Sequence, residues 1–190
     1  MIRIGIDPSM QSTGVCVYNV DEDTNIYYIV PSKMTKKMEA FHHPYVTLLP
    51  YQKESTTDME YSEKEYTKTW NFVRLCEQIS RIISDTITRW PDNHEIEFTM
   101  EGISYGSAGG GQVADLAGLN YMIRTLFVQQ KVNFTIVPPT KLKSFAVGNG
   151  AADKDVMVAS WKKLDKNICG ISDIKIDDLA DAYFLAHYEE

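Results

Sequence analysis

The chain has 190 residues, of which 44% are hydrophobic and 24% charged, and its net charge is -7 at pH 7. This length fits one domain and this composition an ordinary globular protein, without the roughly 18-residue apolar run of a membrane span. The negative charge argues against a nucleic-acid binder with a broadly basic surface, although metal-binding carboxylates count as negative until a metal arrives.

The cysteines and the start of the chain predict the compartment. Cys16, Cys76 and Cys169 are odd in number and unrelated in spacing, so they indicate neither a disulfide framework nor a zinc site. Strand-like residues begin at Ile2, and no signal peptide precedes them. We therefore expect a cytoplasmic protein that is not secreted and has no membrane partner.

The first part of the chain has the pattern of an antiparallel meander. Residues 2–7 and 13–20 read as strands joined by the turn at 8–12, and residues 25–30 read as a third strand. Such short connections are typical of antiparallel pairs. Residues 31–65 show no clean period and contain several prolines and tyrosines, which predicts a long loop or insertion.

Helices and strands alternate in the remainder of the chain. The predicted elements are a helix at 66–90, a strand at 95–101, a helix at 112–130, a strand at 134–137, and helices at 153–164 and 176–187. The apolar stripe of the first helix comprises Phe72, Leu75, Cys76, Ile79, Ile82, Ile83, Ile87 and Trp90. One face of the 153–164 helix carries Val156, Met157, Ser160, Trp161 and Leu164.

This order of elements predicts a single α/β domain. A strand–helix–strand crossover makes the last two strands parallel to each other, whereas the first three form a meander. We expect a mixed five-stranded sheet flanked by helices, with the 31–65 segment inserted into it. The 112–130 helix is apolar nearly all round, so it is buried in the core or against a partner.

Acidic residues follow or join several of these elements. Asp7 ends the first strand and Glu101 the fourth, and parallel neighbours would bring both to the carboxyl edge where ligands bind. Asp178 and Asp181 share one face of the last helix, near its N-terminus. Four acids from three distant segments would repel one another unless a cation joined them. Oxygen ligands favour Mg²⁺ or Mn²⁺ over zinc.

Each acid alone also has an ordinary structural explanation. Asp7 could start a turn, Asp178 could cap the helix, and Asp181 could be solvated. Asp177 competes with Asp178 for the capping role, so the residues alone leave that choice open. The apolar sequence around Asp7 and Asp181 favours a site, because an acid embedded in core-like sequence needs a partner.

Four segments, in order, resemble the RuvC family of Holliday-junction resolvases, which have an RNase H-like fold. They are IGIDPSMQSTGVCVY (4–18), FTMEGISYG (98–106), LKSFAVGNGAADKDVMV (142–158) and DDLADAYFLAHY (177–188). The first departs from the family pattern, because Ser9 stands where glycine is usual. Each motif alone is weak, whereas four in order with compatible spacing cover most of the chain and are specific.

The resemblance implies roles for individual residues. The catalytic acids, which also bind Mg²⁺ with Mn²⁺ as a substitute, would be Asp7, Glu101, Asp178 and Asp181. The D-x-x-D spacing selects Asp178 rather than Asp177. Residues close to the DNA would be Lys143, Lys154, Tyr105, Ser9 and Thr13. The two lysines could also be ordinary solvated residues of the surface. Tyr105 stands one position beyond the usual family aromatic.

The function that the resemblance implies is a metal-dependent, structure-selective endodeoxyribonuclease. It would resolve four-way junctions by paired phosphodiester hydrolysis with two metal ions, as a homodimer joined through the 112–130 helix. The short chain, its early start and the divergent 31–65 insertion together resemble phage or other viral members, which suggests a bacterial or virus-infected cell. Cleavage preference and the function of the insertion stay open.

Other functions remain compatible with parts of the sequence. An RNase H-fold nuclease could act on other branched DNA or on RNA–DNA hybrids, and a non-catalytic module could bind junctions without cutting them. Sugar kinases and actin-like ATPases open with a similar strand and aspartate, but they need two such domains and 190 residues leave little room.

Overall fold

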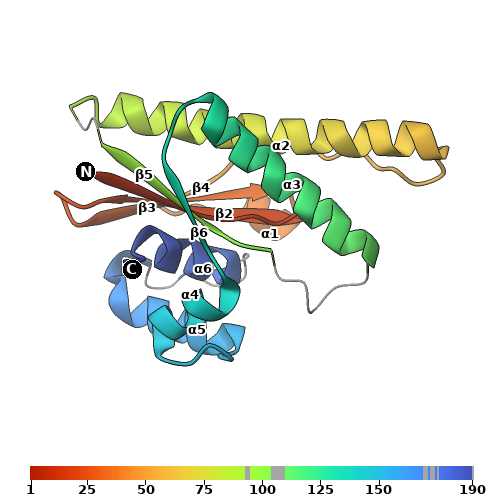
Figure 1. Ribbon diagram of the computed structural model, residues 1–190. Coiled ribbons are helices and arrows are strands. Elements are labelled where there is room, and N and C mark those ends of the chain that lie inside the picture. The colour runs from red at the N-terminus through yellow and green to blue at the C-terminus, as the bar shows by residue number, and fades with distance from the viewer. Residues whose placement is uncertain (93–94, 104–109, 169–170, 172–173, 175, 190) are drawn as a thin grey trace.

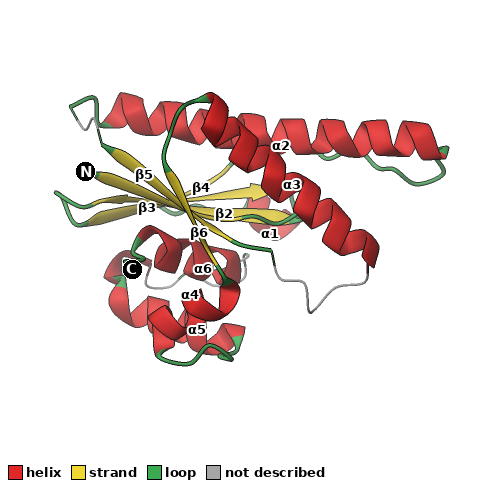
Figure 2. Cartoon of the chain, viewed as in Figure 1, coloured by secondary structure: helices red, strands yellow, loops and turns green. Residues whose placement is uncertain are grey.

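The computed structural model describes residues 1–92, 95–103, 110–168, 171, 174 and 176–189. A mixed six-stranded sheet lies between two layers of helices, with α2 and α3 on one face and α4, α5 and α6 on the other (Figure 1, Figure 2). The strands are β1 (Ile2–Asp7), β2 (Ser12–Asn19), β3 (Thr24–Pro31), β4 (Val46–Leu48), β5 (Ile96–Glu101) and β6 (Phe134–Val137). The helices are α1 (Lys36–Glu39), α2 (Tyr61–Arg89), α3 (Gly110–Gln129), α4 (Pro139–Val147), α5 (Lys154–Leu164) and α6 (Ile176–Ala186).

The sheet confirms the predicted mixed α/β class and adds one strand to it. The order is β4-β3-β2-β1-β5-β6, in which β1, β2 and β3 form the antiparallel meander and β5 and β6 run parallel to β1. The sixth strand, β4, pairs in parallel with β3. It lies inside the 31–65 segment, which also holds α1 and the first residues of α2. Three residues are too few for a periodic signal, so the sequence analysis missed this strand.

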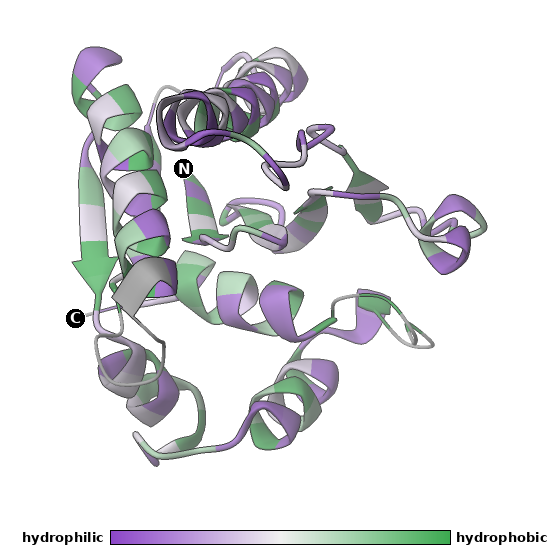
Figure 3. Cartoon of the chain, turned by 90° about the vertical axis from the view of Figure 1, so that its right-hand side faces the viewer, coloured by the Kyte–Doolittle hydropathy of each residue, from purple (hydrophilic) through white to green (hydrophobic). Residues whose placement is uncertain are grey.

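The two faces of the sheet follow the alternation of side chains along each strand. Ile2, Ile4 and Ile6 of β1 point toward α2 and α3 and belong to one buried cluster. A second buried cluster joins the opposite face to α5 and α6. The end-on view shows helices on both sides of the strands (Figure 3). The alternate residues of β1, Arg3, Gly5 and Asp7, therefore belong to the α6 face.

The apolar stripes of the helices are shorter than predicted. Ile87, near the end of α2, is 52% exposed, although it belongs to the apolar stripe seen in the sequence. On α5 only Met157 and Trp161 are buried, whereas Val156 and Leu164 lie at the surface. Thr86 next to Ile87 and Met157 next to Val156 are both buried, so apolar spacing alone does not fix which side of a helix faces the core.

Helix α4 was also missed in the sequence. Pro138 and Pro139 were interpreted as the end of a strand, but Pro138 is the N-cap of α4 and Pro139 its first residue. Proline suits that position, because the first helical residues have no intrahelical partner for their N–H groups. Gly148 ends α4 with φ of 73°, a left-handed conformation that favours glycine. None of the described helices is long and apolar enough to cross a membrane.

Candidate active site

Parallel pairing brings two of the predicted acids to the same place. The β1–β5 register aligns Ile6 with Met100, so the next residues, Asp7 and Glu101, end adjacent strands. Both side chains follow the strand alternation onto the α6 face. Asp7 is buried with 9% of its surface exposed, and Glu101 is partly buried. The expected meeting of these two strand ends at the carboxyl edge is therefore what the structure has.

Two glycines allow α6 to lie directly on the sheet. Gly14 is paired with Asp7 across the β1–β2 ladder, and a Cβ atom at Gly14 would overlap the carbonyl oxygen of Asp178. A Cβ atom at Gly5 would likewise overlap backbone atoms of Ala182 and Ala186. Because backbone packs on backbone here, the first turn of α6 reaches the end of β1. This contact brings Asp178 beside Asp7.

Electrostatic coupling shows that the four acids share one environment. Burial raises the pKa of Asp7 well above its ordinary value, and the charges of Glu101, Asp181 and Asp178 raise it further. Burial and the charge of Asp181 raise the pKa of Glu101 to about 7. Burial raises the pKa of Asp181 to about 6, against the opposing effect of Lys154. We call these four residues, Asp7, Glu101, Asp178 and Asp181, the acidic cluster.

The acidic cluster fits a divalent cation in charge and in donor chemistry. Its donors are carboxylate oxygens, the ligands that Mg²⁺ and Mn²⁺ prefer, and a cation would remove the repulsion that raises these pKa values. Within the described part of the chain, however, no three His, Cys, Asp or Glu side chains converge closely enough to hold an ion. The arrangement is thus a cluster of suitable ligands and not a closed coordination sphere.

The two lysines predicted near DNA lie beside the acidic cluster. Lys154 is the first residue of α5, and its Nζ lies 2.7 Å from Oδ2 of Asp177. Lys143 belongs to α4, and its charge, with that of Lys154, lowers the pKa of Glu101. Asp177 therefore faces Lys154, whereas Asp178 is buried against Gly14. The two neighbouring aspartates, whose roles the residues alone left open, therefore have different surroundings in the structure.

The turn after β1 uses its own hydroxyl groups. The Thr13 hydroxyl donates to the Ser9 carbonyl oxygen at 2.9 Å and accepts from the Ser9 N–H at 3.1 Å. Thr13 is fully buried and its hydroxyl serves the turn, so contact between Thr13 and a substrate stays a prediction. Ser9 is partly exposed, and its Oγ accepts from the N–H of Gln11 at 3.3 Å. Contact between Ser9 and a phosphate stays a prediction.

The predicted contact between Tyr105 and DNA is not tested by the structure, because Tyr105 lies outside the described residues.

Asn120 of α3 supports the site but was not predicted from the sequence. It is 2% exposed and donates from Nδ2 to the Glu101 carbonyl oxygen at 3.1 Å. This bond fixes the end of β5. The available signal was an amide within an otherwise apolar helix, where a buried polar group needs a partner.

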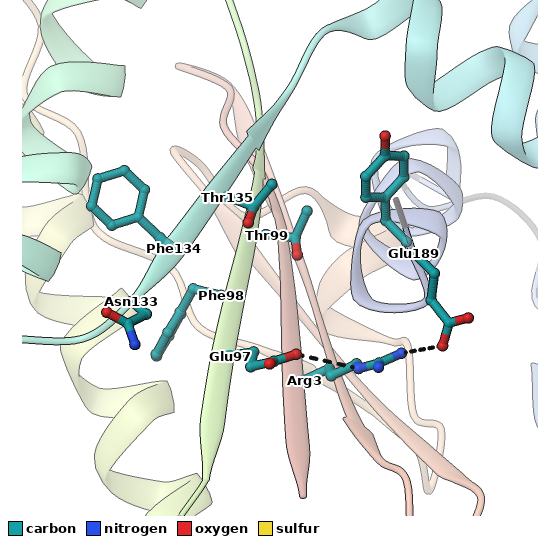
Figure 4. Close-up of a pocket in the computed structure, with 9 residues that line it drawn as sticks. Arg3, Glu97, Phe98, Thr99, Asn133, Phe134, Thr135 and Glu189 are labelled. Atoms are coloured by element: carbon teal, nitrogen blue, oxygen red, sulfur yellow. Dashed lines mark hydrogen bonds and ion pairs between the residues drawn. The ribbon is translucent and has the colours of Figure 1, made fainter.

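A separate hollow of about 350 Å³ lies at the opposite end of β1 and β5. Arg3 reaches across it between the carboxylates of Glu97 and Glu189 (Figure 4). The hollow is also lined by Thr99 and Phe134. Because it contains none of the acidic cluster, we do not assign the candidate chemistry to this place.

No protein-family model and no curated protein matches this chain by sequence. Solved structures do match it. RuvC from Thermus thermophilus has a TM-score of 0.53 at 13% identity, covering 98% of this chain and 91% of that chain. The same protein in complex with a Holliday-junction substrate gives 0.51 at 13% identity, with coverage of 98% and 90%. The yeast mitochondrial Holliday-junction resolvase Ydc2 gives 0.52 at 15% identity, with coverage of 97% and 75%.

At such low identity the likeness concerns the fold. It covers nearly the whole of this chain, including the sheet and α6, from which the acidic cluster comes. The chain therefore has the RNase H-like fold of the RuvC-type Holliday-junction resolvases.

Proposed function

We propose that this protein is a metal-dependent, structure-selective endodeoxyribonuclease that resolves four-way DNA junctions by paired phosphodiester hydrolysis. The observation that carries the proposal is the acidic cluster, in which β1, β5 and α6 deliver carboxylates to one buried place. It occurs in a fold whose solved neighbours are Holliday-junction resolvases. A protein that only bound junctions would have no need to bury mutually repelling acids.

The proposed metal ligands are the members of the acidic cluster, and the proposed ion is Mg²⁺, with Mn²⁺ as a substitute. Bound divalent ions would supply an activated water and neutralise charge at the scissile phosphate, the chemistry of a two-metal site. The protein's own contribution is to hold the carboxylates in place. Gly14 seats Asp178 against the sheet, and Asn120 fixes the end of β5 that carries Glu101.

DNA would approach from the side of α4 and α5. Lys143 and Lys154 place positive charge next to the acidic cluster, which recruits phosphates to an otherwise acidic protein. Such contacts position the backbone without reading base sequence. The proposal therefore predicts junction binding that weakens steeply with salt and depends little on sequence.

Cutting two strands calls for two active sites, and α3 is the proposed dimer surface. Leu119, Ile123 and Phe127 are buried in the chain's own core, but Tyr121 and Val128 of the same helix are more than half exposed. A hollow of about 470 Å³ between α2 and α3 has side chains such as Val73, Met122 and Leu126 along its walls. An apolar surface of this kind is typical of a partner interface.

The decisive experiment compares labelled substrates. A four-way junction, a three-way branch, a linear duplex and an RNA–DNA hybrid are incubated with Mg²⁺, Mn²⁺ or EDTA. We expect paired, symmetric nicks in the four-way junction that require the metal, and Asp7→Asn as a variant that binds without cutting. Glu189→Gln is a matched control, because Glu189 is an exposed acid at the far end of α6.

Other outcomes would redirect the assignment. Equal or better cutting of the hybrid or the three-way branch would retain the nuclease centre but change its substrate. Junction binding without any product in Mg²⁺ or Mn²⁺ would favour a non-catalytic binding module. The size of the protein in solution, measured by light scattering, would test the dimer separately, since the monomer has a mass of 21.6 kDa.

A further inference from the structure

Lys154 lies at the rim of the acidic cluster, and Asp177 holds it there. The Lys154 Nζ is 2.7 Å from Oδ2 of Asp177, with 67% of the lysine side chain and 29% of the aspartate side chain exposed. The lysine charge acts on Asp7, Glu101 and Asp181. The ion pair thus fixes an ammonium group between the buried acids and the solvent from which a substrate arrives.

The stability of α5 does not explain this placement. Lys154 is the first residue of α5, where the positive end of the helix dipole disfavours a cation. Asp177 lies in the first turn of α6, so the ion pair bridges the N-termini of two helices. The bond to this Asp177 oxygen engages one of the three N–H donors of an ammonium group. The remaining donors suit a second acceptor, such as a phosphate oxygen.

We propose that Asp177 is a positioning residue that holds the Lys154 ammonium against a backbone phosphate of the DNA strand to be cut. This inference rests on the proposed function and deepens it. Asp177 then differs in role from its neighbour Asp178, which is buried in the acidic cluster. Holding Lys154 matters because a free lysine side chain loses considerable rotamer freedom when it binds a phosphate.

Loss of charge and loss of positioning change different measured quantities in Asp177→Asn. The substitution removes a negative charge beside the proposed DNA path, so charge alone predicts tighter junction binding. Loss of positioning predicts slower cleavage once the DNA is saturating, because the ammonium no longer lies at a fixed place. A fall in the cleavage rate without weaker binding is therefore the signature of the proposed role.

The kinetic test measures single-turnover cleavage and junction affinity for matched variants. We expect Asp177→Asn to slow cleavage by roughly 10- to 100-fold with equal or tighter binding, and Asp177→Glu to restore much of the rate. Asp155→Asn is the control, since it removes an exposed acid from the same turn of α5 as Lys154. In the Lys154→Gln background, Asp177→Asn should cause no further loss. Wild-type cleavage by Asp177→Asn would overturn the proposal.

A second measurement does not depend on nuclease activity. Trace acylation with an amine-reactive ester, read by mass spectrometry, compares Lys154 with the exposed Lys163 in each variant. We expect Lys154 to become several-fold more reactive in Asp177→Asn and to stay unchanged in Asp155→Asn. Equal reactivity in the wild type and Asp177→Asn would show that the ion pair with Asp177 does not hold Lys154 in place. If acylation shows the ion pair between Asp177 and Lys154 but the wild type cuts no branched DNA, the proposed function fails. Asp177 then has no positioning role in cleavage.

Discussion

The two ends of α6 lie beside different arrangements of charged side chains. At its N-terminal end the acidic cluster gathers carboxylates that raise the pKa values of one another. At its C-terminal end Arg3 lies between two carboxylates, 2.9 Å from Glu189 and 3.5 Å from Glu97 (Figure 4). Strand β1 contributes to both ends, with Asp7 at one and Arg3 at the other.

This contrast separates a structural charge cluster from a candidate active site. The Arg3 group contains opposite charges close to solvent, an arrangement that proteins commonly form at their surfaces and that contributes little to stability. The acidic cluster buries like charges, which costs free energy unless an external cation joins them. Repulsion combined with burial, more than the number of charges, therefore marks the N-terminal end of α6 as the candidate active site.

The largest expected effect comes from the acidic end. Asp7→Asn should lower junction cleavage by more than about a hundredfold, which exceeds the usual cost of losing an outer-shell partner of a metal ligand. The amide is similar in size but carries no charge, so folding and junction binding should survive. Gel assays of cleavage and binding on the same preparation check this. Retained cutting would remove Asp7 from the proposed site.

A second prediction concerns the contact between Gly14 and the backbone of α6. Gly14→Ala should lower the free energy of unfolding by about 3 kcal/mol or more and abolish cleavage, because its Cβ would overlap backbone at Asp178. Gly118→Ala is the control, since its Cβ would meet only the edge of the Phe72 ring, at 3.1 Å. Denaturant unfolding compares the two variants. Equal stability losses would show that α6 does not depend on the Gly14 contact.

The C-terminal end of α6 makes its own prediction about pH. Burial lowers the pKa of His187 to about 4, against the opposing charges of Asp165 and Asp23. Its Nε2 lies 2.9 Å from Oδ1 of Asn25. Because the unfolded chain takes up this proton near pH 6.5, the contribution of His187 to stability is present above that pH. It should fall by about 1 to 3 kcal/mol as the pH drops from 6.5 to 4.

The measurement for His187 is a difference between two proteins. Unfolding free energies are determined between pH 4 and 7 for the wild type and His187→Gln, so that the carboxylates of the acidic cluster contribute equally to both. The wild type should lose more stability on acidification than the variant. Parallel pH profiles would show that His187 does not titrate with folding.

The smallest expected effect is a gain in stability. In EDTA, Asp181→Asn should stabilise the protein by about 1 kcal/mol, because it removes one buried charge from a repelling group. Glu189→Gln should change the melting temperature little, since its ion pair with Arg3 is exposed. Thermal unfolding with and without Mg²⁺ checks this. A destabilising effect of Asp181→Asn in EDTA would contradict the repulsion.

Sequence patterns predicted the parts of the fold that are long or periodic. The bounds of β1 and β6 agree with the prediction, since alternating residues and a following turn or proline define both. Strand β4 has three residues and α4 begins at a proline, so neither showed a recognisable period. The burial of single residues of α2 and α5 depends on how each helix is rotated against the sheet, which local sequence does not encode.

The candidate site was predictable to the extent that its motifs are ordered along the chain. The acids could be proposed because strand ends and an i, i+3 pair indicate shared edges and faces. The different surroundings of Asp177 and Asp178 could not be predicted, because they depend on how α6 is rotated against Gly14 and Lys154. The burial of Thr13 could not be predicted from the sequence either, because a hydroxyl in a turn can bond either the turn itself or a ligand.

The wide separation of the acids along the chain has a consequence for biosynthesis. Asp7 belongs to the first strand, and Asp178 and Asp181 to the last described helix, so the ribosome makes them far apart in time. Strands β1, β2 and β3 can pair as soon as they emerge, because their contacts are local. The acidic cluster forms only when residues 176–186 dock over Gly5 and Gly14. A nascent chain that has not reached α6 would therefore carry no assembled acidic cluster.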